Sequence, residues 1–86
     1  MTAYRVFLTP AVDRQLAKFP GPVREMVAAV LVTLASNPRP TGCVKLSGST
    51  DLWRVRVRDY RIIYTIDDDQ LVVTVVTIGH RKDVYR

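Results

Sequence analysis

The sequence predicts an α+β fold in which an N-terminal strand and a two-helix hairpin precede a mainly antiparallel sheet ending in a three-stranded meander. Alternating apolar residues predict the strands, and apolar residues at helical spacing predict the hairpin. Proline and glycine mark the boundaries of these segments. A chain of 86 residues has room for one hydrophobic core, so we expect a single domain over residues 1–86 with both helices on one face of the sheet.

The N-terminal half begins with a strand at residues 3–8, which alternate and are rich in strand-forming side chains. Thr9 and Pro10 then form a helix start, because a hydroxyl can cap the first turn and proline suits its first position. The segment FPGP at 19–22 ends this helix and begins a second, since residues before proline avoid helical backbone. The apolar stripes consist of Val12, Leu16 and Phe19 in the first helix, and Val23, Met26, Val27, Val30, Leu31 and Leu34 in the second.

The second half of the chain consists of strands. The segment SNPRPTG at 36–42 ends the second helix, and the acidic run at 67–69 marks the turn before the last strand. The strands are predicted at residues 43–46, 52–57, 60–66 and 70–78. The last three are expected to form the meander.

Arginines alternate with apolar residues along the stretch LWRVRVRDYRIIY at 52–64. If residues 58 and 59 form a two-residue turn, Arg56 lies directly opposite Arg61. One face of the hairpin then carries Arg54, Arg56, Arg61 and Ile63, and the other face is apolar. Directly opposed like charges destabilise a sheet unless an anion lies between them. A solvated outer face is the alternative, but three arginines on one face favour an anion-binding site.

The chain leaves the last predicted strand at Ile78 and Gly79 and continues as HRKDVYR. In an antiparallel meander this exit lies at the same end of the sheet as Arg56 and Arg61. The tail is therefore expected to bring cations and proton-exchanging side chains to the arginines: His80, Arg81, Lys82, Tyr85 and Arg86. The alternative is a frayed terminus that only adds charge.

The composition favours a polyanionic partner. The formal net charge is +5, and ten of the 13 basic residues are arginine. A basic domain suits nucleic acid, although a biased genomic base composition gives the same excess. A single cysteine excludes an intrachain disulfide, and the sequence has no cluster of cysteine and histidine suited to a metal. Because no signal pattern or long apolar run occurs, we expect a cytoplasmic protein without membrane contact.

Two stretches, LWRVRVRDYRIIYTI at 52–66 and IGHRKDVYR at 78–86, together with the order of elements, resemble the RelE/ParE superfamily of bacterial toxins and its RelE branch in particular. The resemblance covers nearly the whole chain. It implies the toxin of a type II toxin–antitoxin system, an endoribonuclease that cleaves mRNA in the ribosomal A site without a metal or other cofactor. The implied partners are the ribosome, mRNA and a cognate antitoxin in a hetero-oligomeric complex.

The resemblance also implies roles for individual side chains. Arg54 and Arg56 are expected to hold phosphate, and Arg61 to stabilise the charge developing on it. Arg81 is expected to act as an acid or charge stabiliser, and Tyr85 as the general base. Further phosphate contacts are expected from Arg58, Lys82 and Arg86.

The identity of the general base stays open at this point, because His80 is a second candidate. Histidine readily exchanges a proton near neutral pH, and some members of the superfamily have a catalytic histidine near this position. A lone histidine is also often structural. The best-known RelE branch has lysines in place of Arg54 and Arg56. Arginine holds its proton too firmly to act as a base, so both residues are expected only to clamp phosphate.

Two other functions fit the same predicted fold. A ParE-like toxin poisons DNA gyrase through a protein contact and does not need arginines and a tyrosine that converge on a phosphate. A non-catalytic nucleic-acid-binding module is the third possibility. The predicted arginine-bearing face, however, has few of the aromatic side chains on which bases stack in single-strand binders.

Overall fold

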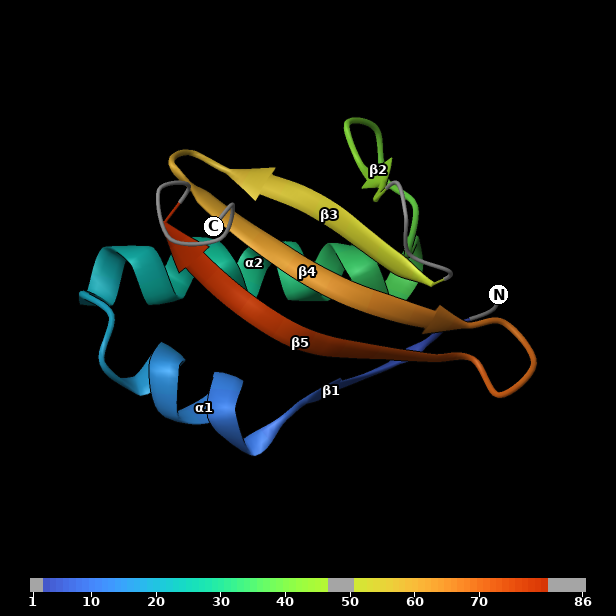
Figure 1. Cartoon of the computed structure of the whole chain (residues 1–86), viewed down its shortest axis with the longest axis horizontal. Helices are drawn as coiled ribbons and strands as arrows, with labels where there is room; N and C mark the ends of the chain where they lie inside the picture. Colours follow the sequence, from blue (N-terminus) through green and yellow to red (C-terminus); the bar gives the residue numbers. More distant parts are fainter. Residues whose placement is uncertain (1–2, 47–50, 81–86) are drawn as a thin grey trace.

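The computed structural model describes residues 3–46 and 51–80 of the chain. These residues follow the predicted order of one strand, two helices and four strands (Figure 1). The elements are β1 (Arg5–Leu8), α1 (Pro10–Ala17), α2 (Gly21–Ser36), β2 (Val44–Lys45), β3 (Leu52–Val57), β4 (Tyr60–Asp67) and β5 (Val72–His80). Within the described ranges, neither helix is long and apolar enough to cross a membrane.

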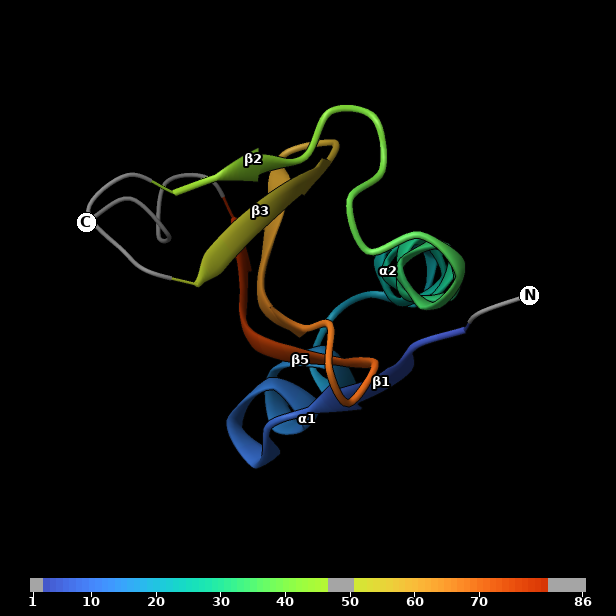
Figure 2. The ribbon, with the colours of Figure 1, turned by 90° about the vertical axis from the view of Figure 1, so that its right-hand side faces the viewer.

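The five strands form one mixed sheet in the order β1-β5-β4-β3-β2. β3, β4 and β5 form the predicted antiparallel meander, and β2 extends it as an antiparallel neighbour of β3. β1 lies at the other edge, parallel to β5, a pairing that the sequence pattern does not specify. α2 lies within the concave side of the curved sheet, and α1 packs against β5 and β1 (Figure 2). The predicted α+β fold is confirmed.

The helical hairpin begins and turns where the sequence predicts. The Thr9 Oγ1 accepts a hydrogen bond from the Val12 amide at 3.3 Å and caps α1, whose first residue is Pro10. Pro20 is the N-cap residue of α2, so the FPGP segment separates the two helices. The Arg24 guanidinium donates a hydrogen bond to the Phe19 carbonyl at 2.8 Å, which holds this corner together.

The core lies between the helices and the inner, concave face of the sheet. Tyr64 is fully buried, and its hydroxyl donates a hydrogen bond to the Pro38 carbonyl at 2.8 Å. Burial raises the pKa of the Tyr64 phenol. The buried apolar residues are Val12, Val27 and Leu34 from the helices, and Val55, Val57, Ile62, Tyr64, Val73, Val75 and Ile78 from the sheet.

The last strand lies two residues later than predicted, at Val72–His80 rather than 70–78. At its start, the Asp67 carboxylate accepts hydrogen bonds from the Asp69 and Gln70 amides, each at 3.0 Å. Leu71 has a positive φ of 57°, so the chain is still turning there. The turn therefore includes two residues, 70 and 71, that the alternation pattern assigns to the strand. At its other end β5 continues to His80, because His80 pairs with Tyr60 of β4.

Candidate functional site

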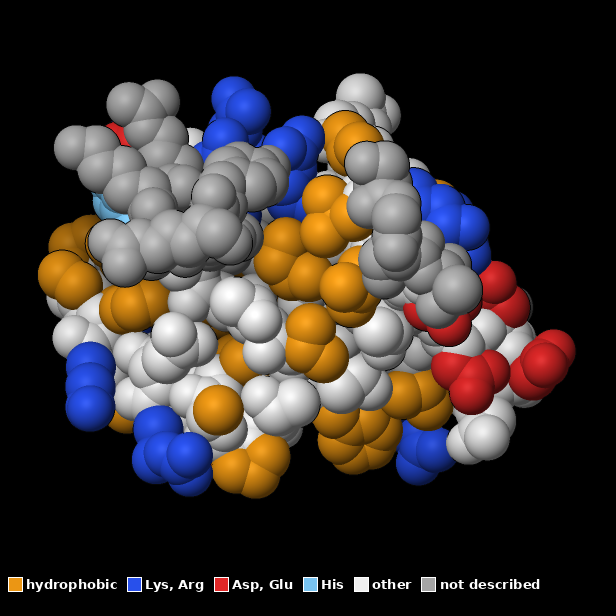
Figure 3. All heavy atoms as spheres, in the orientation of Figure 1, with side chains coloured by type: hydrophobic (Ala, Val, Ile, Leu, Met, Phe, Trp, Pro, Cys, Tyr) orange, Lys and Arg blue, Asp and Glu red, His pale blue; other side chains and the backbone are white. Residues whose placement is uncertain are grey.

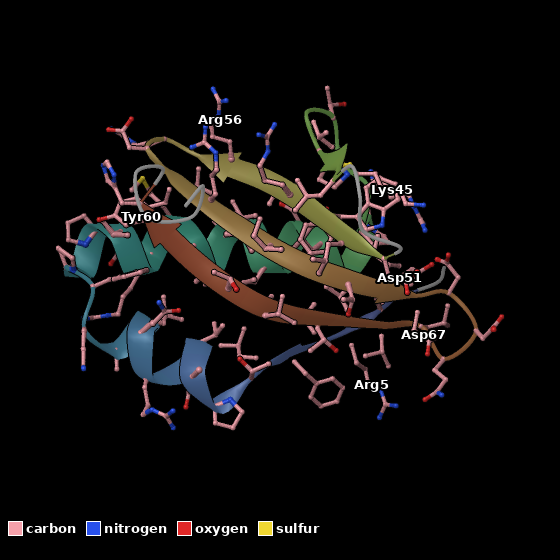
Figure 4. All side chains as sticks on the ribbon, in the orientation of Figure 1. Arg5, Lys45, Asp51, Arg56, Tyr60 and Asp67 are labelled. Atoms are coloured by element: carbon pink, nitrogen blue, oxygen red, sulfur yellow. The ribbon has the colours of Figure 1, made fainter. Side chains whose placement is uncertain are left out.

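Three arginines of β3 and β4 lie on the outer face of the sheet, the face that points away from α2. The β3–β4 register pairs Arg56 with Arg61 and Arg54 with Ile63, as the two-residue turn predicts. Because side chains alternate along a strand, Arg54, Arg56 and Arg61 share this face. In Figure 4 the Arg56 side chain extends from β3 away from both helices. We call these three residues the arginine face.

The three side chains of the arginine face differ in how far they are enclosed. Arg61 is only 7% exposed, and among the described residues it is the one charged side chain that is buried. Arg54 is half-buried and Arg56 is exposed. Charged side chains are almost never buried without a reason, so Arg61 does not fit a merely solvated outer face. A cation in such an enclosed position acts more strongly on an anion than the same cation in open water.

On the other side of β4, Arg61 is paired in the strand ladder with Gly79 of β5. Because glycine has no side chain, no β5 side chain lies directly opposite Arg61 on the outer face. The row formed by Arg56, Arg61 and Gly79 is one residue inside the end of the sheet, where Tyr60 pairs with His80. The arginine face and the end of β5 therefore meet at one end of the sheet, as predicted (Figure 1).

His80 is not placed as the sequence predicts. It is the last residue of β5, paired with Tyr60, rather than the first residue of a tail. Alternation along β5 puts His80 on the inner face together with Tyr60, whereas Arg61 lies on the outer face. The His80 ring meets the Tyr60 ring edge-on, with centroids 5.7 Å apart and an interplanar angle of 80°. The strand pairing therefore separates His80 from the arginine face.

Arg58 lies in the β3–β4 turn rather than on the arginine face. It is exposed and has a positive φ of 54°, which allows the tight turn that brings Arg56 opposite Arg61. Acidic side chains gather at the other end of the sheet, around the β4–β5 turn (Figure 3). There Asp51 and residues 65–69 line a depression in the surface. Within residues 3–46 and 51–80, no three His, Cys, Asp or Glu side chains are arranged to hold a metal ion.

A second polar cluster, which sequence reasoning missed, joins three distant segments at this acidic end. Arg39 contacts both Asp68 carboxylate oxygens, at 2.9 and 3.2 Å, and the Tyr4 hydroxyl donates to the same carboxylate at 2.7 Å. The hydrogen bonds from Arg39 and then Tyr4 lower the pKa of the Asp68 carboxyl, and the bond to Asp68 raises the pKa of Tyr4. Arg39 also lies 5.0 Å from the ring centroid of Trp53. No local pattern signals such long-range contacts.

The other predicted site residues, Arg81, Lys82, Tyr85 and Arg86, lie outside the residues that the structure describes. Their convergence on the arginine face stays a prediction. The described part of the chain thus contains the three arginines predicted to act on phosphate: a row of cations on the outer face, one of them enclosed, beside the end of β5.

Comparison with known protein families shows which proteins this chain is similar to. Residues 6–85 match the family described as ParE toxin of type II toxin-antitoxin system, parDE. The chain belongs to the RelE/ParE superfamily of toxins. The predicted resemblance is thereby confirmed over nearly the whole chain.

Individual members of the superfamily support the RelE branch. The chain is 31% identical to the mRNA interferase toxin RelE of Escherichia coli strain K12 over 71 residues, which cover 80% of this chain and 74% of that toxin. It is 32% identical to the toxin RelE of Mycobacterium tuberculosis, over 96% of this chain and 87% of the relative. An archaeal RelE–RelB complex from Pyrococcus horikoshii contains a chain with a TM-score of 0.84 and 26% identity, covering 96% of this chain and 100% of that one.

Proposed function

We propose that this toxin is a ribosome-dependent endoribonuclease that cleaves mRNA in the ribosomal A site and so inhibits translation. The observation that carries the proposal is the direct pairing of Arg56 with Arg61, with Arg54 on the same face and Arg61 enclosed. Opposed guanidinium groups are unfavourable neighbours until an anion lies between them. Guanidinium is also the side-chain group whose geometry best matches the oxygen pairs of a phosphate.

The chemistry that these groups suit is attack of the RNA 2′-hydroxyl on the neighbouring phosphorus. The P–O5′ bond breaks as the new P–O2′ bond forms, giving a 2′,3′-cyclic phosphate and a 5′-hydroxyl. Arg54 and Arg56 hold the phosphate, and Arg61 stabilises the charge that develops on it. Arg58, Lys82 and Arg86 contact flanking phosphates. The reaction proceeds without a metal, because the arginines supply the positive charge.

Proton transfer in this proposal belongs to the terminal residues. Tyr85 takes the proton of the 2′-hydroxyl, and Arg81 supports the leaving 5′-oxygen as an acid or charge stabiliser, as the superfamily resemblance implies. His80 is the alternative base. Its position on the inner face, beside Tyr60, favours Tyr85.

A ParE-like gyrase poison is the second candidate function, because the matching family is described by the parDE system. The arginine face favours RNA cleavage, since a protein contact does not require an enclosed arginine paired with a second one. A non-catalytic nucleic-acid-binding module is the third candidate. We place a cognate antitoxin with this protein in a hetero-oligomeric complex, as the RelE–RelB complex of Pyrococcus horikoshii suggests. We expect this complex in the cytoplasm, where translating ribosomes are.

Primer extension on mRNA with purified ribosomes tests the proposal. The protein is expected to produce cleavage at codon positions only when ribosomes occupy the message, and the Arg61→Ala variant is expected to produce almost none. Arg14→Ala is the matched control, because it removes an exposed arginine from α1 and not from the arginine face. Inhibition of gyrase supercoiling without mRNA cleavage would support the ParE-like function instead, and RNA binding without cleavage would support the third.

A further inference from the structure

Three aromatic rings lie in a row beside the inner face of the sheet, at the end where the arginine face lies; they meet tilted or edge-on, and we call this row the stack. The Phe19 and Tyr60 ring centroids are 5.2 Å apart, and those of Tyr60 and His80 are 5.7 Å apart. Phe19 follows α1, Tyr60 is the first residue of β4 and His80 is the last residue of β5. The stack therefore connects the corner between the helices to the ends of two neighbouring strands.

This stack is adjacent along the chain to the residues of the arginine face. Tyr60 directly precedes Arg61, and His80 directly follows Gly79, the partner of Arg61 on β5. The Tyr60–His80 and Arg61–Gly79 pairs are consecutive rungs of one ladder, with side chains on opposite faces. Any shift of the Tyr60–His80 rung is passed through one peptide unit to the Arg61–Gly79 rung.

The end of β5 needs such an anchor for two reasons. Strand ends open more readily than strand centres, because fewer contacts hold them. Gly79 makes the end of this strand looser still, since glycine loses more backbone freedom on folding than any other residue and offers no side chain to pack. His80 is then the residue that ties the last rung of β5 to a ring on β4 and, through that ring, to Phe19.

We propose that His80 is a positioning residue: its ring, in edge-on contact with Tyr60 and through it with Phe19, holds the Arg61–Gly79 rung where Arg61 can stabilise the charge that develops on the phosphate. His80 acts as an aromatic ring and not as a carrier of the reaction's proton. The inference rests on the proposed cleavage activity, but the placement of the rung is a property of the toxin alone.

Two variants of His80 distinguish a role as a positioning ring from a role as a proton carrier. His80→Phe keeps an aromatic ring and removes the exchangeable proton, whereas His80→Gln keeps polarity and removes the ring. We expect His80→Phe to keep the wild-type kcat, KM and pH–rate profile in ribosome-dependent cleavage. We expect His80→Gln to lower kcat by about 10- to 100-fold with KM little changed, because small misplacements at a reacting centre cost about this much.

Variants of Tyr60 test whether His80 acts through the stack. Tyr60→Phe is expected to behave as wild type, and Tyr60→Leu to lower kcat as His80→Gln does. The double variant Tyr60→Leu/His80→Gln is expected to be no worse than either single variant, since both remove the same contact. All rates are compared at a temperature well below the melting temperature of each variant.

Hydrogen exchange of the free toxin gives a readout that does not depend on cleavage. The amides of residues 78–80 and of Arg61 are expected to exchange faster in His80→Gln and at the wild-type rate in His80→Phe. If the wild-type protein cleaves nothing but the exchange pattern holds, the proposed function fails and the positioning of the rung stands. Loss of activity in both His80 variants would make His80 the proton carrier, and full activity in both would leave it without a role. Either result overturns the proposal.

Discussion

Arg56 and Arg61 are direct partners across the β3–β4 ladder, with both side chains on the outer face of the sheet. Arg61 is almost fully enclosed, whereas Arg56 is exposed, so the pair presents one fixed and one accessible cation. An anion that binds at this pair meets donors from two strands at once.

The first prediction concerns the enclosed arginine. Arg61→Ala is expected to lower ribosome-dependent cleavage by about 10²-fold or more, which is typical of a lost charge-stabilising group. Arg61→Met retains more of the buried volume and removes the charge, and it is expected to lose as much activity. Arg61→Lys keeps a charge without the planar fork and is expected to be intermediate. Circular dichroism checks that each variant is folded. Full cleavage by a folded Arg61→Met variant would remove Arg61 from the mechanism.

The second prediction is that Arg56 lowers the stability of the free toxin. Replacing it by glutamine removes a directly opposed like charge and is expected to raise the free energy of unfolding by about 0.2–1 kcal/mol. Urea unfolding at low salt measures the gain, which is expected to shrink as salt screens the exposed charge. Arg14→Gln on α1 is the control for a general effect of net charge. A loss of stability at low salt would show that the pair is not repulsive.

The third prediction tests Tyr85 as the general base. Tyr85→Phe is expected to lose cleavage and to keep ribosome binding, because the ring remains and only the hydroxyl is removed. Single-turnover cleavage and a ribosome co-sedimentation assay measure the two properties separately. A chain stopped after Lys82 is expected to behave in the same way. If the stopped chain cleaves as fast as the full chain, the terminal residues have no part in the chemistry.

The fourth prediction concerns the buried Tyr64 hydroxyl. Tyr64→Phe leaves the Pro38 carbonyl without its donor and is expected to lower the free energy of unfolding by about 1–2 kcal/mol, without changing the arginine face. Burial raises the pKa of Tyr64 in the folded state. Its stabilising contribution is therefore complete below the ordinary tyrosine pKa of about 10 and is lost as pH rises through the folded value. Alkaline unfolding is expected to depend less on pH in Tyr64→Phe than in the wild type.

The fifth prediction concerns Asp68, which joins Arg39 and Tyr4. Asp68→Asn is expected to lower the melting temperature slightly at neutral pH, since the pair is exposed. The pKa of the Asp68 carboxyl is lowered in the folded state, chiefly by Arg39. Its contribution is present above the ordinary aspartate pKa of about 3.9 and is lost as pH falls through the folded value. The melting temperatures of wild type and variant should therefore converge in acid. A constant difference would contradict the assignment.

Local patterns were enough to predict the elements and the arginine pairing. Thr9 and Pro10 mark a helix start by their own chemistry, and the turn at Arg58 and Asp59 fixes the register that pairs Arg56 with Arg61. What could not be predicted depends on contacts far apart in the chain. The β1–β5 pairing, the burial of Arg61 and the contacts of Asp68 with Arg39 and Tyr4 leave no mark in any short window of sequence.

The placement of His80 shows the same limit at a single residue. The sequence HRKDVYR is polar and basic, so it favours a tail that starts after Gly79. The strand continues because β4 begins at Tyr60, which provides both a ladder partner and a ring for His80. The end of a strand depends on its partner strand as much as on its own residues. Because β5 extends along β4 to His80, this residue lies on the opposite face of the sheet from the arginines.

The parallel pairing of β1 with β5 has a consequence for how the toxin is made. Among the described residues β1 is the first strand and β5 the last, yet they are neighbours in the sheet. A nascent chain therefore cannot complete the sheet until β5 has left the ribosome that synthesises it. The Arg61–Gly79 rung is equally late, because Gly79 lies near the end of β5. The Arg56–Arg61 pair needs only β3 and β4, so it can form before β5 joins, and the end of the sheet is completed last.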